Sequence, residues 1–142
     1  MGKRRKSREI IIQVLYQLDM SDGDAEENFN LFWQHFNPSD ELKEFSQEIV
    51  QGVCKHREEI DALIEKHSKH WRLKRMPIID KNILRSAIFE LMFCPDTPVK
   101  VIINEAIELG KKFSSEKSSP FINGILDKVS HQVTRLQPAA GQ

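Results

Sequence analysis

Apolar residues recur every three or four positions along almost the whole chain, which is the spacing of one face of an α-helix. Phe29, Phe32, Trp33 and Phe36 give the clearest example, at i, i+3, i+4 and i+7. With the intervening turn and capping residues, the pattern predicts helices over about residues 3–19, 28–36, 39–54, 57–68, 79–91, 98–113 and 119–133. Residues 69–77 are interpreted as a connector.

The run of β-branched residues from Val99 to Ile103 is ambiguous, because such residues also favour strands. The helical period continues to Phe113, however, and a strand would not hold it. Thr97 is expected to cap this helix and Pro98 to be its first residue, while Ser119 and Pro120 open the last helix. No segment has the alternation of a half-buried strand, so the fold class is predicted as all-α, a compact bundle of six to seven helices.

Length and composition favour one domain that buries its own core, with 142 residues of which 39% are hydrophobic. No apolar run approaches the roughly 20 residues that cross a bilayer, so we expect a cytoplasmic protein without a membrane partner. Cys54 and Cys94 lie in apolar patterns and are expected to be reduced core thiols. Residues 137–142 are expected to form a flexible tail.

Charge is segregated at the start of the chain. Lys plus Arg and Asp plus Glu number 21 each, yet five of the first eight residues are cationic: Lys3, Arg4, Arg5, Lys6 and Arg8. On a helix, Arg4, Arg8, Ile12 and Tyr16 would follow one another at i, i+4 spacing. Cations that bind phosphates beside a ring that stacks on an unpaired base suit single-stranded RNA. The alternative is a frayed, solvated terminus ahead of an ordinary core helix.

A second cationic group lies on or just after the predicted helix 98–113. It comprises Lys100, Lys111, Lys112 and Lys117, with Phe113 and Phe121 nearby. If this helix packs near the first, the lysines would extend the basic arm and the rings would offer stacking surfaces. Alternatively both rings belong to the core.

Catalytic and metal chemistry have weak candidates. His67 and His70 lack further ligands at a metal spacing, Cys54 with His56 is too short a signal, and no phosphate-binding glycine loop occurs. Glu105 and Glu108 are interpreted as a solvated face or as ion-pair partners of nearby lysines. We therefore expect no catalytic residue, no metal and no cofactor. A glycine inside a helix, as at Gly124, indicates close packing against another helix or a bound chain.

Four blocks of the sequence, in this order, resemble the NusB family of bacterial transcription antitermination factors. They are Arg4-Arg5-Lys6-x-Arg8-Glu9 leading to Gln13-x-Leu15-Tyr16, then Asp80-x-Asn82-Ile83-Leu84-Arg85, then Ile103-Asn104-Glu105-Ala106-Ile107-Glu108-Leu109-x-Lys111-Lys112-Phe113, and Phe121-Ile122-Asn123-Gly124-Ile125-Leu126-Asp127-Lys128. Each block alone is weak, but four in the correct order and spacing are highly specific.

The resemblance implies one domain over residues 1–136, with an N-terminal helical subdomain over about 1–77 and a C-terminal one over about 78–136. It implies no enzymatic activity. It implies that the protein binds single-stranded boxA RNA together with the ribosomal protein NusE, and joins other Nus factors on RNA polymerase, notably at ribosomal RNA genes.

By position, the residues that the resemblance assigns to RNA are Arg4, Arg5, Lys6, Arg8, Gln13 and Tyr16, with Lys100, Phe113 and Phe121 less securely. Lys3, Lys112 and Lys117 join them as neighbouring cations, and Asp80 is assigned to the side that faces NusE. The chain departs from the family at Gly110, where Ala is usual. If Gly110 is exposed, we expect it to loosen its helix by roughly 1 kcal/mol.

Two alternatives stay open. One is a ribosome-assembly or protein-interaction module whose basic arm touches RNA non-specifically. The other is the RNA-targeting domain of a methyltransferase, which the length of the chain disfavours. Relatives occur as monomers and as homodimers, so the sequence leaves the oligomeric state open.

Overall fold

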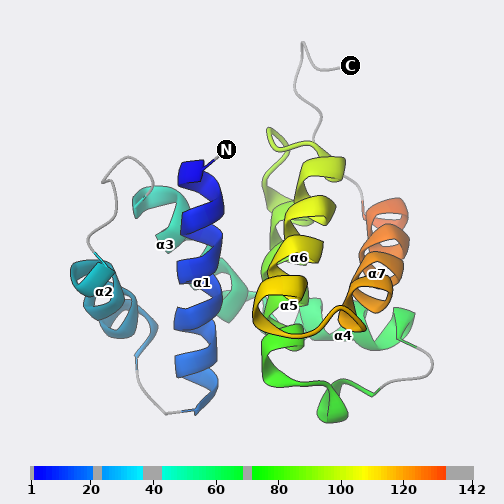
Figure 1. Cartoon of the computed structure of the whole chain (residues 1–142), viewed down its shortest axis with the longest axis horizontal. Helices are drawn as coiled ribbons and strands as arrows, with labels where there is room; N and C mark the ends of the chain where they lie inside the picture. Colours follow the sequence, from blue (N-terminus) through cyan, green and yellow to red (C-terminus); the bar gives the residue numbers. More distant parts are fainter. Residues whose placement is uncertain (1, 21–23, 37–42, 69–71, 134–142) are drawn as a thin grey trace.

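The computed structural model is built of α-helices joined by short connections (Figure 1). It describes residues 2–20, 24–36, 43–68 and 72–133, and every structural statement below concerns this part of the chain. The helices are α1 (Gly2–Met20), α2 (Ala25–Phe36), α3 (Lys43–Lys55), α4 (Arg57–His67), α5 (Ile78–Phe93), α6 (Val99–Phe113) and α7 (Ser118–Gln132), with a short 3₁₀ turn η2 (Leu73–Arg75). Seven α-helices and no strand in the described ranges confirm the predicted fold class, including the helix at the ambiguous β-branched run.

Helix α5 forms the centre of the molecule. It packs against α1, α3, α4, α6 and α7, so that Ile83, Leu84, Ile88 and Leu91 have no exposed surface. Figure 1 shows α1, α2 and α3 on one side of it and α6 and α7 on the other, with α4 crossing between the two groups. In α2, the rings of Phe29 and Trp33 stack with centroids 5.4 Å apart, as expected for an apolar aromatic face. The division into two subdomains stays a prediction.

Capping residues were expected in the turn before the second helix, and helix starts were expected at Pro98 and at Ser119; the first of these expectations is confirmed. The backbone N–H of Glu27 donates to Oδ2 of Asp24 at 3.0 Å, which caps α2. The other two differ from the prediction by one residue. Pro98 has extended backbone angles (φ −61°, ψ 145°) and occupies the N-cap position without a side-chain hydrogen bond, so α6 begins at Val99. Helix α7 begins at Ser118, which places Pro120 third in the helix.

The glycines of the helices have different roles. A Cβ atom on Gly52 of α3 would overlap the Phe89 ring of α5, and one on Gly110 of α6 would lie 2.9 Å from Cδ1 of Ile122 on α7. Both glycines therefore permit close helix packing, and Gly110 is buried, so the exposed loosening considered above does not apply. Gly124 is exposed and a Cβ there would meet no atom within 4 Å. The prediction that Gly124 marks close packing against another helix is wrong for this chain.

The two cysteines are free, as expected, but the expectation of two core thiols is wrong. Cys54 is exposed and Cys94 is only partly buried. Desolvation of the thiol still raises the pKa of Cys54, against the opposing charge of Arg57. None of the described helices combines the length and apolar character that a membrane span requires. His70, the turn at residues 21–23 and 37–39, and the tail at 137–142 lie outside the described residues.

Candidate nucleic-acid interface

The basic arm is the first turns of α1, and its arginines contact three different neighbouring helices. The guanidinium of Arg4 lies 4.1 Å from the centroid of the Phe45 ring on α3, a cation–π distance. Arg5 pairs with Glu105 on α6, and Arg8 pairs with Glu90 on α5. These contacts contradict the alternative of a frayed terminus for residues 4–8.

Arg8 and Glu90 form a buried, doubly hydrogen-bonded ion pair. Nε and Nη2 of Arg8 donate to the two carboxylate oxygens of Glu90 at 3.0 and 2.8 Å. The residues are 6% and 2% exposed. Burial lowers the pKa of Arg8, but the hydrogen bonds and charge of Glu90 outweigh it, so the pKa is raised overall. Arg8 is therefore a charge held inside the fold, beneath the surface that RNA would reach.

Arg5 and Glu105 form a similar pair at the surface. Nε and Nη2 of Arg5 donate to the Glu105 carboxylate at 3.0 and 2.7 Å. The hydrogen bond from Arg5 lowers the pKa of Glu105, with burial acting in the opposite direction and the charge of Arg5 reinforcing the shift. The Arg5 side chain remains 47% exposed. A guanidinium has five N–H donors, so Arg5 keeps donors free of Glu105 for a ligand.

A second link between α1 and α6 lies further along both helices. Nζ of Lys112 donates to Oε2 of Glu9 at 2.8 Å, and Lys6 lies 4.0 Å from the other oxygen of Glu9. The linked residues enclose a cavity of about 190 Å³ between the helices. Because the pairs join residue 5 to 105 and residue 9 to 112, the helices run in the same direction (Figure 1). Arg5 of the basic arm and Lys112 of the second cationic group therefore line one groove, together with Glu9, Glu105 and Glu108. That the other lysines of the second group extend the arm stays a prediction.

Tyr16 on α1 and Phe113 on α6 lie beyond this groove, toward the C-terminal ends of their helices, and Phe121 lies on α7. Tyr16 is 37% exposed. Phe113 and Phe121 are partly buried and pack against the core. Each ring therefore contributes to the core, as the alternative held, and also keeps some exposed surface. Nζ of Lys112 lies 5.5 Å from the centroid of the Phe113 ring. Phe113 therefore combines exposed surface with a neighbouring cation, as base stacking on a phosphate-binding surface requires.

The remaining predicted residues are placed as follows. Lys100 on the first turn of α6 and Lys117 just before α7 are exposed, and Gln13 is partly buried. Lys3 lies in α1, but its side chain is outside the described part of the structure. Lys111 pairs with Glu108 at 3.4 Å, as the ion-pair interpretation of Glu108 expected.

Asp80, assigned to the partner-facing side, has no exposed surface. Its Oδ2 accepts a hydrogen bond of 2.9 Å from the hydroxyl of Ser118. Its Oδ1 is buried without a hydrogen-bond partner among the described residues. In this structure Asp80 therefore reaches no partner directly.

The sequence reasoning named Glu105 as an ion-pair partner but not of Arg5, and it missed Glu9, Glu90 and a second charge network. Arg85 on α5 is buried and donates to Asp61 of α4 at 2.8 Å and to Asp19 of α1 at 3.1 Å. Arg57 also reaches Asp19, at 2.8 Å. One signal was available, because Arg85 and Glu90 stand in the largely apolar stretch 83–93 and buried charges need partners.

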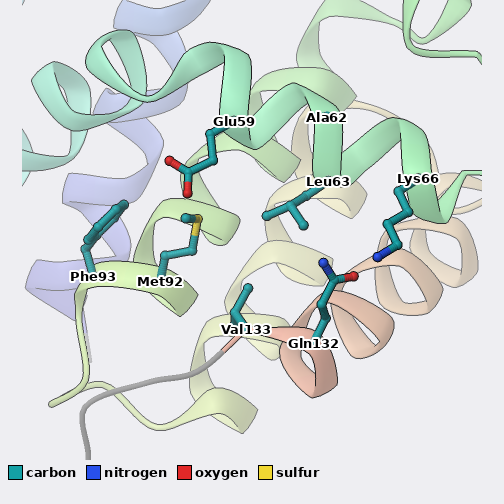
Figure 2. A pocket seen from close by; sticks show the side chains of 8 residues that line it. All are labelled: Glu59, Ala62, Leu63, Lys66, Met92, Phe93, Gln132 and Val133. Atoms are coloured by element: carbon teal, nitrogen blue, oxygen red, sulfur yellow. The ribbon is translucent and has the colours of Figure 1, made fainter.

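A larger hollow of about 570 Å³ lies between α4, the end of α5 and the end of α7 (Figure 2). Figure 2 shows Leu63, Met92 and Val133 directed toward its interior, with Glu59 and Lys66 on α4 above them. It has a single cation and shares no lining residue with the α1 and α6 groove. Across the described residues, no three His, Cys, Asp or Glu side chains gather as metal ligands do.

Comparison with known proteins gives one consistent result. The family model of the NusB family matches residues 5–131. The transcription antitermination protein NusB of Myxococcus xanthus is 50% identical over 134 residues, covering 92% of this chain and 96% of that protein. The structure of T. maritima NusB has a TM-score of 0.86 and 33% identity, covering 92% of each chain. A structure of the antitermination factors NusB and NusE in complex with double-stranded RNA has a TM-score of 0.84 and 28% identity, covering 93% of this chain and 98% of that one.

Proposed function

Because the chain belongs to the NusB family, we propose that it is a transcription antitermination factor that binds single-stranded boxA RNA together with the ribosomal protein NusE. Through that complex it joins other Nus factors and RNA polymerase, notably at ribosomal RNA genes. It acts as an adaptor in the cytoplasm and has no enzymatic activity of its own.

The observation that supports this proposal is the groove between α1 and α6. It brings Arg5 of the basic arm and Lys112 of the second cationic group, which are far apart in the sequence, to the same pocket, where Arg5 pairs with Glu105 and Lys112 with Glu9. Lys6, with a side chain 60% exposed, and Lys112, 58% exposed, carry charge at its rim. Exposed cations on both helices suit a chain of phosphates, and the partly exposed rings of Tyr16 and Phe113 lie further along α1 and α6.

Single-stranded RNA fits these side chains better than a duplex does. A ring can stack only on a base that is unpaired, whereas duplex RNA offers mainly phosphates and 2′-hydroxyls across its minor groove. The related NusB and NusE complex was solved with double-stranded RNA. Both forms therefore belong in the test, and we expect the single strand to bind more tightly.

Arg8 supports this surface although its own side chain is buried. Its guanidinium is held by Glu90, so it fixes the first turns of α1 against α5 and supports the more exposed Arg4, Arg5 and Lys6. Replacing Arg8 would disturb the fold, so the RNA test uses exposed cations.

The test measures the affinity for a boxA-type RNA, a scrambled RNA of equal length and a duplex, over a range of salt concentrations with and without NusE. We expect a preference for boxA that NusE strengthens, and a steep loss with salt. Lys6→Ala should weaken binding and reduce the salt slope by about 0.7, as for one lost phosphate contact on a single strand. Lys66→Ala, an exposed lysine at the other hollow, is the matched control and should change neither quantity.

Two outcomes would contradict the proposal. Equal affinity for boxA and scrambled RNA, even with NusE, would favour the alternative of an interaction module with non-specific RNA contact. If neither salt nor Lys6→Ala changed the RNA affinity, the groove would not be the RNA-binding site.

A further inference from the structure

Asp80 lies in the first turn of α5, wholly buried, and is bonded to the loop that joins α6 to α7. A buried carboxylate is costly, and the N-terminal turn of a helix is where its negative charge is best tolerated. Oδ2 accepts from Ser118, whereas Oδ1 has no partner among the described residues. A buried carboxylate with one unsatisfied oxygen is a costly way to stabilise a fold, so its presence calls for a reason other than stability.

The hydroxyl of Ser118 also lies 3.1 Å from the hydroxyl of Ser114. Since Ser118 donates its single hydroxyl proton to Asp80, Ser114 must be the donor in this second bond. Ser114 follows the last residue of α6, and Ser118 is the first residue of α7. One carboxylate therefore ties both ends of the loop 114–118 to the start of α5.

This loop carries part of the surface assigned to RNA. Lys117 precedes Ser118 directly and is exposed, and Phe113 precedes Ser114. The backbone of Lys117 is fixed near helical angles (φ −67°, ψ −23°) by its junction with α7. The direction of Lys117 thus depends on where Ser118 is held.

We propose that Asp80 is a positioning residue of the RNA-binding surface, which acts through Ser118 to fix the loop between α6 and α7 and the Lys117 side chain on it. The inference rests on the proposed function. It assigns Asp80 a role opposite to direct partner contact: the carboxylate stays inside the fold and sets the geometry of the loop that follows α6.

The test combines a mutant cycle with the salt dependence of RNA binding. Asp80→Ala, Ser118→Ala and the double variant should each weaken binding of the boxA-type RNA about fivefold at 0.1 M salt and lower the salt slope by about 0.7, as for one lost phosphate contact. Because both changes break the same bond, the double variant should be no weaker than either single one. Lys117→Ala should give the same loss, and adding Ser118→Ala to it should add little.

Two further variants separate positioning from general damage. Ser118→Thr keeps the hydroxyl and should restore most of the affinity and the full salt slope. Ser115→Ala, an exposed serine of the same loop, should leave both unchanged. Circular dichroism confirms that each variant is folded at the temperature of the measurement.

The outcomes are distinguishable. If the unaltered protein binds boxA-type RNA but Asp80→Ala and Ser118→Ala keep its affinity and salt slope, the positioning role is overturned and the proposed function stands. Additive effects of the two changes would also overturn it. If the unaltered protein does not bind the RNA, both proposals are overturned.

Discussion

Among single residues, Arg8 and Glu90 make the most consequential contact of the arm. Removing one partner of a buried ion pair leaves the other charge desolvated, which costs about 3–5 kcal/mol. We therefore expect Arg8→Ala to lower the free energy of unfolding by about that amount, measured by urea denaturation. Arg4→Ala, which loses a cation–π contact with the Phe45 ring at the surface, should cost about 1 kcal/mol or less.

A paired replacement provides the control for this prediction. Changing Arg8 to Met and Glu90 to Leu together removes both charges and keeps similar volume, so most of the lost stability should return. A double variant as unstable as Arg8→Ala alone would mean that the pair of charges is not the source of the effect.

The pair of Arg5 and Glu105 predicts a dependence of stability on pH. The folded state holds the pKa of Glu105 below its ordinary value of 4.5, so the unfolded chain takes up the proton first as the pH falls. The stabilisation is therefore present above about pH 5 and is lost as the pH falls through the lowered pKa. Glu105→Gln should reduce the free energy of unfolding more at pH 7 than at pH 3. A reduction equal at both pH values would contradict this assignment. Arg5→Gln, which removes the other partner of the pair, should also reduce the free energy of unfolding more at pH 7 than at pH 3.

At the scale of whole helices, the space around each helical glycine decides whether an added Cβ atom would collide with a neighbouring helix. Gly52→Ala would force the Phe89 ring away from α3, and overpacking of this kind typically costs about 1–3 kcal/mol. Gly124→Ala adds a methyl group into open space on α7 and should stabilise by about 0.5–1 kcal/mol through helix propensity. Thermal unfolding of the two variants measures both effects. A shift of the same sign in both would contradict the packing role of Gly52.

Helices were predictable from the sequence because their signal is local. The apolar period and the capping of α2 by Asp24 depend on residues within a few positions of one another, so the predicted and observed ranges differ by only a few residues. The site was predictable only as a composition of cations and rings. Which carboxylate holds each cation depends on contacts between residues 82 to 103 positions apart, and no local pattern encodes those pairings. Asp80 illustrates the limit: its burial and its hydrogen bond depend on Ser118, which lies at the start of α7 and which no pattern around residue 80 indicates.

For the molecule as a whole, the contacts of α1 predict that the two groups of helices unfold together. Arg5, Arg8 and the network around Arg85 join α1 to α6, α5 and α4 by ion pairs, and α1 also packs on α5. Trp33 of α2 reports on the N-terminal group once Trp71, the other tryptophan, is replaced by Phe. In urea, Trp33 fluorescence and far-ultraviolet circular dichroism should follow one coincident transition. Arg85→Ala should shift both curves together to lower urea concentration. If Trp33 loses its native signal before the helices melt, the N-terminal group unfolds as a separate unit and the ion pairs do not couple it to α5.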